Sequence, residues 1–398
     1  MKVPLLDIKK QIKPLRKEIL SSIKDVVDSG QYILGKKVLE LEEKMSSYCG
    51  TKRAIGVSSG TDALLVSLMS LDIKPGDVVI TTPYSFFATA GVIARLSAIP
   101  VFVDIDPISY NIDPDELKET LTNCKSGKVS EKRFDISKVK AIIPVHLYGQ
   151  CANMEKIMKM SSDFNIPVIE DAAQAIGSEY LENNKVRKSG SFGLTGCFSF
   201  FPSKNLGCMG DGGIVTTSSD EVYDKILKLR VHGSKPKYFH KTVGGNFRLD
   251  PIQAAILLVK FPHLDKWHNL RQSNSDFYTN SFIEIFNGSE NCPVFPKRVN
   301  KNPELKFDHI FNQYTIRVKN RDSLKLFLKE NNIDTEIYYP LSLHLQECFD
   351  YLQYKPGDFP NSELVSKETL ALPIFPELKE SQQTFVVRKI YEFFKKNF

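Results

Sequence analysis

Short β-branched runs alternate with segments of helical periodicity between residues 52 and 220, and this alternation is the feature that most restricts the fold. The runs predicted as strands span residues 54–59, 78–83, 100–105, 140–147, 167–171, 196–201 and 212–217. Helical patterns occupy residues 62–71, 86–98 and 154–164. Strands that alternate with helices are typical of an α/β fold, so we predict a large domain with a mostly parallel central sheet.

The pattern changes in the second half of the chain. A long helical stretch covers residues 251–282, and Pro262 is expected to break or kink it. The elements predicted after it are a strand at residues 312–318 and helices at residues 321–332 and 382–396. This mixture indicates a smaller α+β domain.

We therefore expect two domains in the chain. Residues 1–250 would form an N-terminal segment and the large α/β domain, and residues 251–398 the connecting helix and the small α+β domain. The polar segment at residues 125–138 lacks periodicity and is expected to be a surface loop or insertion.

Composition sets limits on the class of protein. The 398 residues are 42% hydrophobic and 25% charged, which is ordinary for a soluble globular protein. The net charge of +6 is compatible with small anionic substrates, but no dense basic run interleaved with aromatics indicates nucleic-acid binding. The chain starts without a signal-peptide pattern and has no apolar run near the ~20 residues that span a membrane. Seven scattered cysteines without a C-x-x-C pair favour a reducing, cytoplasmic compartment over a zinc or disulfide framework.

A turn at residues 58–61 joins a predicted strand to a predicted helix. Gly60 makes the turn, and Thr61 adds a hydroxyl donor to the free N–H groups of the helix start. Helix N-termini bind anions such as phosphate, so the turn is a candidate phosphate site. Taken alone, ordinary helix capping by Ser, Thr and Asp is the favoured explanation of these residues.

An aromatic pair follows the next strand, in TTPYSFFATA. Phe86 and Phe87 stand where the strand ends and a helix begins. Core packing is the ordinary explanation of such a pair, but open α/β sheets bind ligands at the carboxyl ends of their strands.

Two carboxylates end a buried strand in PVIEDAAQAIG, and an amide follows them. Glu170 and Asp171 end the strand, and Gln174 comes three residues later. Metal ligands, an acid/base pair or a partner for a buried cation are the possible roles. A metal needs several convergent ligands that no other motif clearly supplies, so the cation-partner interpretation is favoured and no metal is expected.

A lysine separates an aromatic run from a glycine-rich run in FSFFPSKNLGCMGDGG. Ser199 lies on the predicted strand, and Lys204 follows a short turn. Apolar neighbours remove water from a lysine and lower its pKa, which suits an amine that forms imines. An exposed loop lysine is the alternative. Further on, VGGNFRLDPIQAAI offers Asn246 and Arg248 before a helix, either as phosphate or carboxylate donors or as surface residues.

Together these motifs match the needs of one cofactor, pyridoxal 5′-phosphate (PLP). This cofactor needs a lysine for its aldehyde, an anion beside its ring nitrogen, a phosphate cup and a flat neighbour for its ring. Lys204, Asp171, the 58–61 turn with Ser199, and Phe86 supply these four groups.

The motifs also resemble, nearly from end to end, those of the DegT/DnrJ/StrS-type nucleotide-sugar aminotransferases, which are fold type I PLP enzymes. The matching segments are SGQYILGKKVLELEE, SSGTDAL, PYSFFATA, VFVDID, PVHLYGQ, IEDAAQAIG, FSFFPSKNLGCMGDGG, RVHG, GGNFRLDPIQAA, YYPLSLHLQ and LALPIFPEL. The resemblance implies a large PLP-binding domain with a smaller C-terminal domain, and an enzyme that transfers an amino group.

The resemblance also implies roles for single residues. Lys204 matches the Schiff-base lysine, Asp171 the acid at the ring nitrogen, and Gln174 the neighbour of the phenolic oxygen. Residues matched to the other cofactor contacts are Phe86 on the ring face and Gly60, Thr61 and Ser199 at the phosphate. Asn246 matches a phosphate ligand supplied by the neighbouring subunit, which implies a homodimer with shared active sites.

Substrate recognition is less well defined by the resemblance. The candidate sugar-nucleotide contacts are Arg248, His232, Tyr238, Tyr339 and His344, and further cations available for the diphosphate are Arg230, Lys36, Lys235 and Lys237. Relatives often have His-Tyr-Pro where this chain has Tyr338, Tyr339 and Pro340, so sugar recognition there is expected to differ.

The resemblance predicts transfer from L-glutamate to a dTDP- or UDP-linked keto sugar, with 3-keto favoured over 4-keto, for amino sugars of surface polysaccharides such as the lipopolysaccharide O-antigen. The alternatives are a PLP-dependent sugar dehydratase and a non-catalytic regulatory relative. Dehydratases of the family replace the lysine with histidine, whereas Lys204 is present here.

Overall fold

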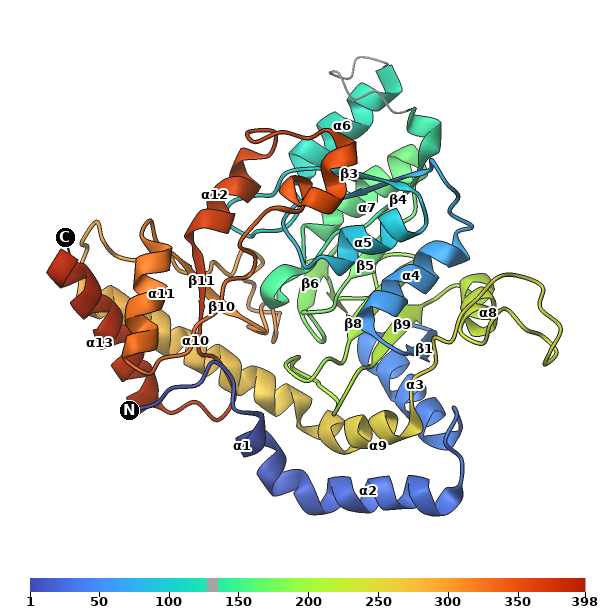
Figure 1. Cartoon of the computed structure of the whole chain (residues 1–398), viewed down its shortest axis with the longest axis horizontal. Coiled ribbons are helices and arrows are strands. Elements are labelled where there is room, and N and C mark those ends of the chain that lie inside the picture. Colours follow the sequence, from blue (N-terminus) through green and yellow to red (C-terminus); the bar gives the residue numbers. More distant parts are fainter. Residues whose placement is uncertain (127–134, 398) are drawn as a thin grey trace.

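The computed structural model describes residues 1–126 and 135–397 of the chain, and it contains each strand predicted for the large domain (Figure 1). These strands are β1 (Arg53–Val57), β2 (Val78–Thr81), β3 (Ile99–Phe102), β4 (Val139–Ile142), β5 (Ile169–Asp171), β8 (Thr195–Ser199) and β9 (Gly213–Thr217). Of the loop predicted at residues 125–138, residues 127–134 lie outside the described part of the chain, and a short 3-10 helix, η2 (Ile136–Lys138), ends it.

The strands form two ladders that meet at the centre of the large domain. One ladder has the order β3-β2-β4 and is parallel, and the other has the order β1-β9-β8-β5. Parallel bridges from Ile142 to Val168 and from Val145 to Asp171 join β4 to β5. The predicted mostly parallel sheet is therefore confirmed.

Strand β9 is the exception, because it runs antiparallel to both β1 and β8. A parallel return needs a crossover of about a dozen residues or more, usually a helix. Residues 200–212 contain turns and no helix, so the chain reverses and β9 pairs antiparallel with the strand it has just left. Lys204 lies in this reversal.

Helices surround the sheet. They are α3 (Lys36–Cys49), α4 (Gly60–Ser70), α5 (Ala88–Arg95), α6 (Pro114–Ser126), α7 (Met154–Phe164) and α8 (Asp220–Leu229). Helix α4 packs against β8 and β9, and its residues Ala63 to Leu68 are all buried. A hairpin of β6 (Glu179–Glu182) and β7 (Lys185–Lys188) follows β5.

The predicted break at Pro262 is confirmed. Helix α9 (Pro251–Lys260) ends at the 3-10 turn η4 (Phe261–His263), and α10 (Leu264–Phe286) continues toward the C-terminal part of the chain (Figure 1). The N-terminal helices α1 (Ile8–Ile12) and α2 (Arg16–Ser29) precede α3, and α2 packs along α9.

A second core lies at the other end of α10. It contains the antiparallel pair β10 (Tyr314–Arg317) and β11 (Thr369–Leu372), with α11 (Arg321–Glu330), α12 (Pro360–Glu368) and α13 (Glu380–Asn397) nearby. Tyr278 and Phe282 of α10 are fully buried in this core, and so is Val3 from the start of the chain. The division of the chain after residue 250 stays a prediction.

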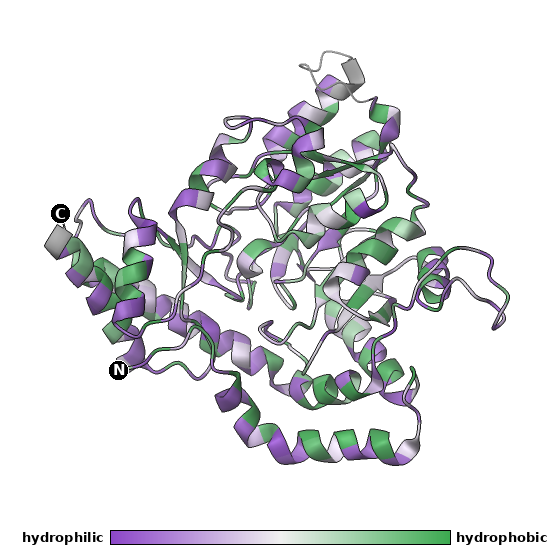
Figure 2. Cartoon of the chain, in the orientation of Figure 1, coloured by the Kyte–Doolittle hydropathy of each residue, from purple (hydrophilic) through white to green (hydrophobic). Residues whose placement is uncertain are grey.

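The outer helices carry hydrophilic and hydrophobic residues side by side, as expected for helices with one face on a core (Figure 2). Among the helices of residues 1–126 and 135–397, none is long and apolar enough to cross a membrane.

Candidate active site

Lys204 and Asp171 meet at the carboxyl ends of neighbouring strands. Asp171 ends β5 and Lys204 follows β8, and the two strands are hydrogen-bonded in parallel. Desolvation lowers the pKa of the half-buried Lys204 amine from 10.5 to about 8, while the carboxylate of Asp171 opposes that shift. A substantial fraction of the amine is therefore neutral near physiological pH.

Asp171 is buried, with 5% of its surface exposed. Its Oδ2 accepts a hydrogen bond from Thr89 Oγ1 at 2.8 Å, and its Oδ1 accepts one from the Ala173 N–H at 3.2 Å. Desolvation raises the pKa of Asp171, and these donors together with Lys204 act in the opposite direction. The site thus holds a buried carboxylate that favours a cation beside it.

The turn at residues 58–61 forms the start of α4, as predicted. Ser59 caps the helix by accepting from the Asp62 N–H at 3.0 Å, and Gly60 and Thr61 occupy its first turn. A Cβ at Gly60 would lie 2.6 Å from the Ser199 Cβ, so the turn and the end of β8 are in close contact. A Cβ at Gly213 would likewise lie 2.3 Å from the Ser59 carbonyl oxygen. Small residues therefore leave the free N–H groups of α4 beside the Ser199 hydroxyl.

Phe86 precedes α5 and leaves 58% of its surface exposed, which is unusual for a large aromatic residue and excludes the core-packing interpretation. Its ring centroid lies 6.2 Å from that of Tyr339, which comes from the C-terminal part of the chain. Two parts of the molecule thus bring aromatic rings to the same place.

Gln174 connects the large domain to Tyr339. Its Oε1 accepts from the Tyr148 N–H at 2.7 Å, and its Nε2 donates to the Tyr339 hydroxyl at 3.0 Å. Because the Tyr339 oxygen accepts this bond, its own proton remains available for another acceptor. Burial and the nearby Asp171 raise the pKa of Tyr339, so the hydroxyl stays protonated.

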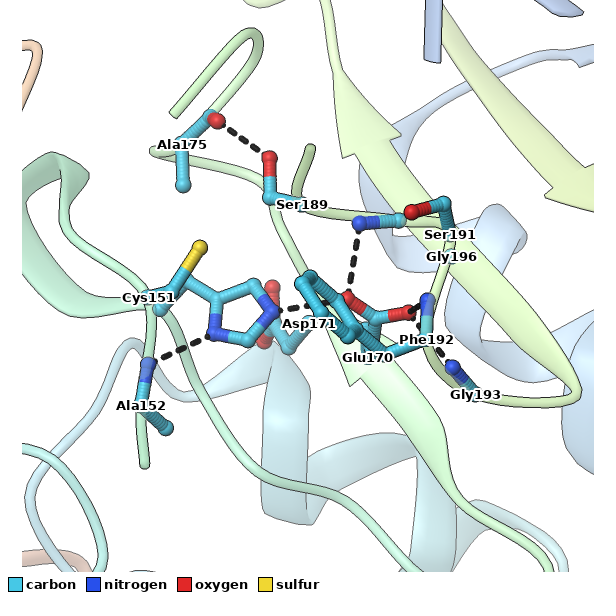
Figure 3. Close-up of polar contacts among 12 residues, drawn as sticks. Cys151, Ala152, Glu170, Asp171, Ala175, Ser189, Ser191, Phe192, Gly193 and Gly196 are labelled. Carbon is cyan, nitrogen blue, oxygen red and sulfur yellow. Dashed lines mark hydrogen bonds and ion pairs between the residues drawn. The ribbon is translucent and has the colours of Figure 1, made fainter. Parts of the chain in front are cut away.

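Glu170, the other carboxylate of the pair, has a different environment (Figure 3). It accepts from the backbone N–H groups of Gly190, Phe192 and Gly193 at 2.6–2.7 Å. It also contacts His146 Nε2 at 2.9 Å. His146 Nδ1 accepts from the Ala152 N–H, so the ring proton lies on Nε2 and faces Glu170. Glu170 therefore holds a loop and a histidine in place rather than facing Lys204.

Asn246 and Arg248 lie beside the end of β1. A bridge pairs Arg248 with Val57, and the Ser58 N–H donates to the Phe247 carbonyl at 3.1 Å. The segment is thus tied to the turn at residues 58–61, with Asn246 exposed and Arg248 partly exposed.

The other predicted substrate residues lie in different surroundings. His232 and Tyr238 are exposed, and Tyr238 leaves 77% of its surface free. His344 is buried and its Nε2 contacts Glu363 Oε1 at 3.2 Å, next to the ring of Phe359.

Arg230 departs from the sequence-based expectation. A cation for a diphosphate has to reach the substrate, but Arg230 is buried and paired with Glu42, with 2.5 Å between its Nη1 and Glu42 Oε1. Both side chains also bond Gly56, so this ion pair fastens the end of α8 to β1.

The residues that converge here fit PLP. An amine with a lowered pKa suits an aldehyde, and a buried carboxylate suits a protonated ring nitrogen. The close approach of Gly60 and Gly213 to their neighbours leaves a cup of N–H and hydroxyl donors that suits a phosphate. Phe86 offers the exposed aromatic face for the ring.

Two residues of this site were not identified from the sequence. Thr89, which bonds Asp171, and Ser85, which bonds Thr89 at 2.8 Å, both lie in the motif PYSFFATA. The spacing of the two hydroxyls by four residues, one helical turn, was the only available signal.

The chain is similar to known proteins over nearly its whole length. The model of the DegT/DnrJ/EryC1/StrS aminotransferase family matches residues 13–391. A pleiotropic regulatory protein of Geobacillus stearothermophilus is 48% identical over 395 residues, 99% of each chain. A UDP-N-acetyl-3-dehydro-alpha-D-glucosamine 3-aminotransferase of Acidithiobacillus ferrooxidans is 38% identical over 96% of this chain and 95% of its own. The crystal structure of Streptomyces venezuelae DesV with a ketimine intermediate superposes with a TM-score of 0.87 at 33% identity, covering 98% of both chains.

Proposed function

Because this chain belongs to the DegT/DnrJ/EryC1/StrS aminotransferase family, we propose that it transfers an amino group from L-glutamate to the keto group of a nucleotide-linked sugar. Aminotransferases of this family use PLP, and the chain is a PLP-dependent aminotransferase with a fold type I architecture. The meeting of Lys204 and Asp171 at adjacent strand ends is the observation that carries the assignment of the catalytic residues.

When bound, PLP supplies an aldehyde that bonds to amines and a ring that withdraws electrons from the carbon next to the nitrogen. Lys204 is proposed to hold the aldehyde, because its lowered pKa keeps part of its amine neutral. Once an amino donor has displaced it, Lys204 Nζ would be free to take a proton from the donor's α-carbon. It would then deliver that proton to the carbon that had been the aldehyde carbon of PLP.

Asp171 is proposed to hold the ring nitrogen in its protonated form. A buried carboxylate with a cation beside it is more favourable than either charge alone. Phe86 would cover one face of the ring, and the N–H groups of Gly60 and Thr61 with the Ser199 hydroxyl would bind the phosphate. Gln174 would lie at the phenolic oxygen, and its bond to Tyr339 ties the C-terminal part of the chain to that position.

A homodimer with shared sites is part of the proposal. Phe86, Tyr238 and Val243 leave 58%, 77% and 87% of their surfaces exposed in the single chain. Asn246, which matches a phosphate ligand supplied across the dimer, is exposed in the same segment as Val243. These features support contact with a second copy, in which Arg248 and Tyr339 would lie near the sugar nucleotide.

The 3-keto preference is supported by the name of the A. ferrooxidans relative, which acts on a UDP-linked 3-dehydro sugar. The G. stearothermophilus relative carries a regulatory name, which corresponds to the alternative of a non-catalytic regulatory relative. The lowered pKa of the Lys204 amine, the buried carboxylate of Asp171 and the exposed ring of Phe86 support an enzyme over a non-catalytic regulator.

A substrate panel tests the proposal. UDP- and dTDP-linked 3-keto and 4-keto sugars would each be incubated with the PLP-loaded protein and L-glutamate. Product mass would report amination, and NMR would report the carbon that carries the nitrogen. Amination of a 3-keto sugar is expected. Amination of 4-keto sugars alone would move the proposed site of amination from carbon 3 to carbon 4. No amination of any sugar would contradict the proposal.

A further inference from the structure

Thr89 lies directly behind the carboxylate of Asp171. It is the second residue of α5 and is fully buried, and its Oγ1 lies 2.8 Å from Asp171 Oδ2, although 82 residues separate the two in sequence. Its N–H donates to the Phe86 carbonyl, so the same turn carries the exposed aromatic ring. The same turn of the chain thus carries Phe86, whose ring is exposed at the site, and Thr89, which contacts the buried carboxylate of Asp171.

The direction of the hydrogen bonds follows from the number of protons. An ionised carboxylate only accepts, so the single hydroxyl proton of Thr89 points to Asp171. Ser85 Oγ lies 2.8 Å from Thr89 Oγ1 and must therefore donate to it. Both hydroxyls are buried, with 2% or less of either residue exposed. Two protons are consequently aligned in a chain from Ser85 through Thr89 to Asp171.

The other side chains around Asp171 do not take the place of the hydroxyls of Thr89 and Ser85. The hydrogen bonds of His146 go to other groups, because its Nδ1 accepts from the Ala152 N–H and its Nε2 contacts Glu170. Burial raises the pKa values of Cys197 and Tyr339, so both stay neutral.

Lys204 is the cation that stabilises the carboxylate, and the Ala173 N–H is its backbone donor. Among the described residues, Thr89 is the side chain that donates a hydrogen bond directly to Asp171.

We propose that Thr89 and Ser85 are positioning residues that hold Asp171 ionised and in one orientation toward the cofactor ring nitrogen. The inference rests on the proposed role of Asp171. If Thr89 lost its hydroxyl, the carboxylate would keep its burial but lose a donor, and its proton affinity would rise. Asp171 would then be neutral in a larger fraction of molecules, most of all at low pH.

Four variants test this inference: Thr89→Val, Thr89→Ser, Ser85→Ala and Thr315→Val. Valine matches threonine in shape but lacks the hydroxyl, and serine keeps it. Thr315 is a fully buried threonine on β10 whose hydroxyl finds no hydrogen-bond partner among the described residues, so its valine variant controls for the loss of a buried hydroxyl. The dissociation constant of PLP would be measured with each apoenzyme by equilibrium dialysis, from weakly acidic to weakly alkaline pH.

Thr89→Val is expected to weaken PLP binding roughly 10- to 100-fold, since hydrogen bonds to charged groups are among the stronger ones. The loss of PLP affinity in Thr89→Val, relative to the unaltered protein, should grow as the pH falls. Thr89→Ser should restore binding to within about 3-fold of the unaltered protein, and Ser85→Ala should fall between the two. Thr315→Val should bind PLP as the unaltered protein does. A purely structural role for Thr89 would give a deficit that does not change with pH.

Asp171→Asn separates failure of the inference from failure of the assignment it rests on. If Asp171→Asn loses affinity while Thr89→Val and Ser85→Ala follow the profile of the unaltered protein, the inference is overturned. If Asp171→Asn also binds PLP normally, the assigned role of Asp171 fails first. Should Thr89→Val not fold, Ser85→Ala carries the test alone, because it leaves Thr89 in contact with the carboxylate.

Discussion

Glu170 and Asp171 are neighbours at the end of β5, yet their carboxylates belong to separate hydrogen-bond networks. Glu170 binds His146 and the backbone N–H groups of Gly190, Phe192 and Gly193 (Figure 3). Asp171 instead accepts from the Thr89 hydroxyl and the Ala173 N–H. Successive residues of a strand point to opposite faces, so one carboxylate braces the fold and the other faces the site. Substitution of Glu170 is therefore expected to lower stability, whereas substitution of Asp171 is expected to slow the reaction.

Glu170→Gln should lower the stability of the apoenzyme. The new amide would place N–H groups against the donors of Gly190 or His146, leaving buried polar groups unsatisfied. A loss of about 2–4 kcal/mol in the free energy of unfolding is expected, measured by urea denaturation. Glu43→Gln, at an exposed position on α3, should change it by less than about 0.5 kcal/mol. Equal effects of the two substitutions would contradict the bracing role of Glu170.

Asp171→Asn should leave stability nearly intact but slow the reaction. Burial already raises the pKa of this carboxyl, so removing its charge costs the fold little. Without the anion, the ring nitrogen loses its protonated form, and the half-reaction with glutamate should slow by about 100-fold or more. Single-turnover kinetics and a melting curve measure the two effects. A rate close to that of the unaltered enzyme would refute the role.

Gly60→Ala should weaken binding of the cofactor through its phosphate. The added methyl group would lie 2.6 Å from the Ser199 Cβ and would push the 58–61 turn away from β8. We expect PLP affinity to fall by about 10-fold or more, because charge-assisted bonds from N–H groups and the hydroxyl would lengthen. Pyridoxal, which lacks the phosphate, is the control ligand in the same dialysis assay. A similar loss for both ligands would place the defect elsewhere than the phosphate cup.

Capture of PLP by the apoenzyme should depend on pH through Lys204. Only the neutral amine attacks the aldehyde, so the capture rate should rise with pH and level off above about 8. Asp171 raises the pKa of Lys204, so Asp171→Asn should move the plateau to lower pH. Stopped-flow absorbance measures the rate, with a free alkylamine correcting for ionisation of PLP itself. A capture rate that keeps rising until the pH reaches about 10.5, the pKa of an ordinary lysine, would mean that Lys204 is not desolvated.

Much of this site could be predicted from the sequence, because its parts stand at strand ends that the alternating pattern locates. Parallel strands bring their carboxyl ends to one edge, so the strand pattern places Thr61, Phe86, Asp171 and Lys204 at the same edge of the sheet. The antiparallel course of β9 was not predicted, because the pattern of a buried strand does not reveal its direction.

Other features depend on tertiary contacts that local sequence does not encode. Arg230 has the charge of a phosphate ligand, but its pairing with Glu42 across 188 residues removes it from that role. Thr89 looks like an ordinary helix residue until α5 is packed against β5. Strand alternation separates Glu170 from Asp171, but only the folded chain shows which of them faces Lys204.

The central claim is that Lys204 is the residue that bonds the cofactor. Lys260 provides a demanding control, because it is buried and its pKa, like that of Lys204, is lowered to about 8. It donates to the Gly207 carbonyl rather than facing Asp171. The holoenzyme would be reduced with borohydride and digested, and the modified peptide identified by mass spectrometry. The account predicts the cofactor on Lys204, its loss in Lys204→Ala and its retention in Lys260→Met. Cofactor found on Lys260, or still attached after Lys204→Ala, would contradict it.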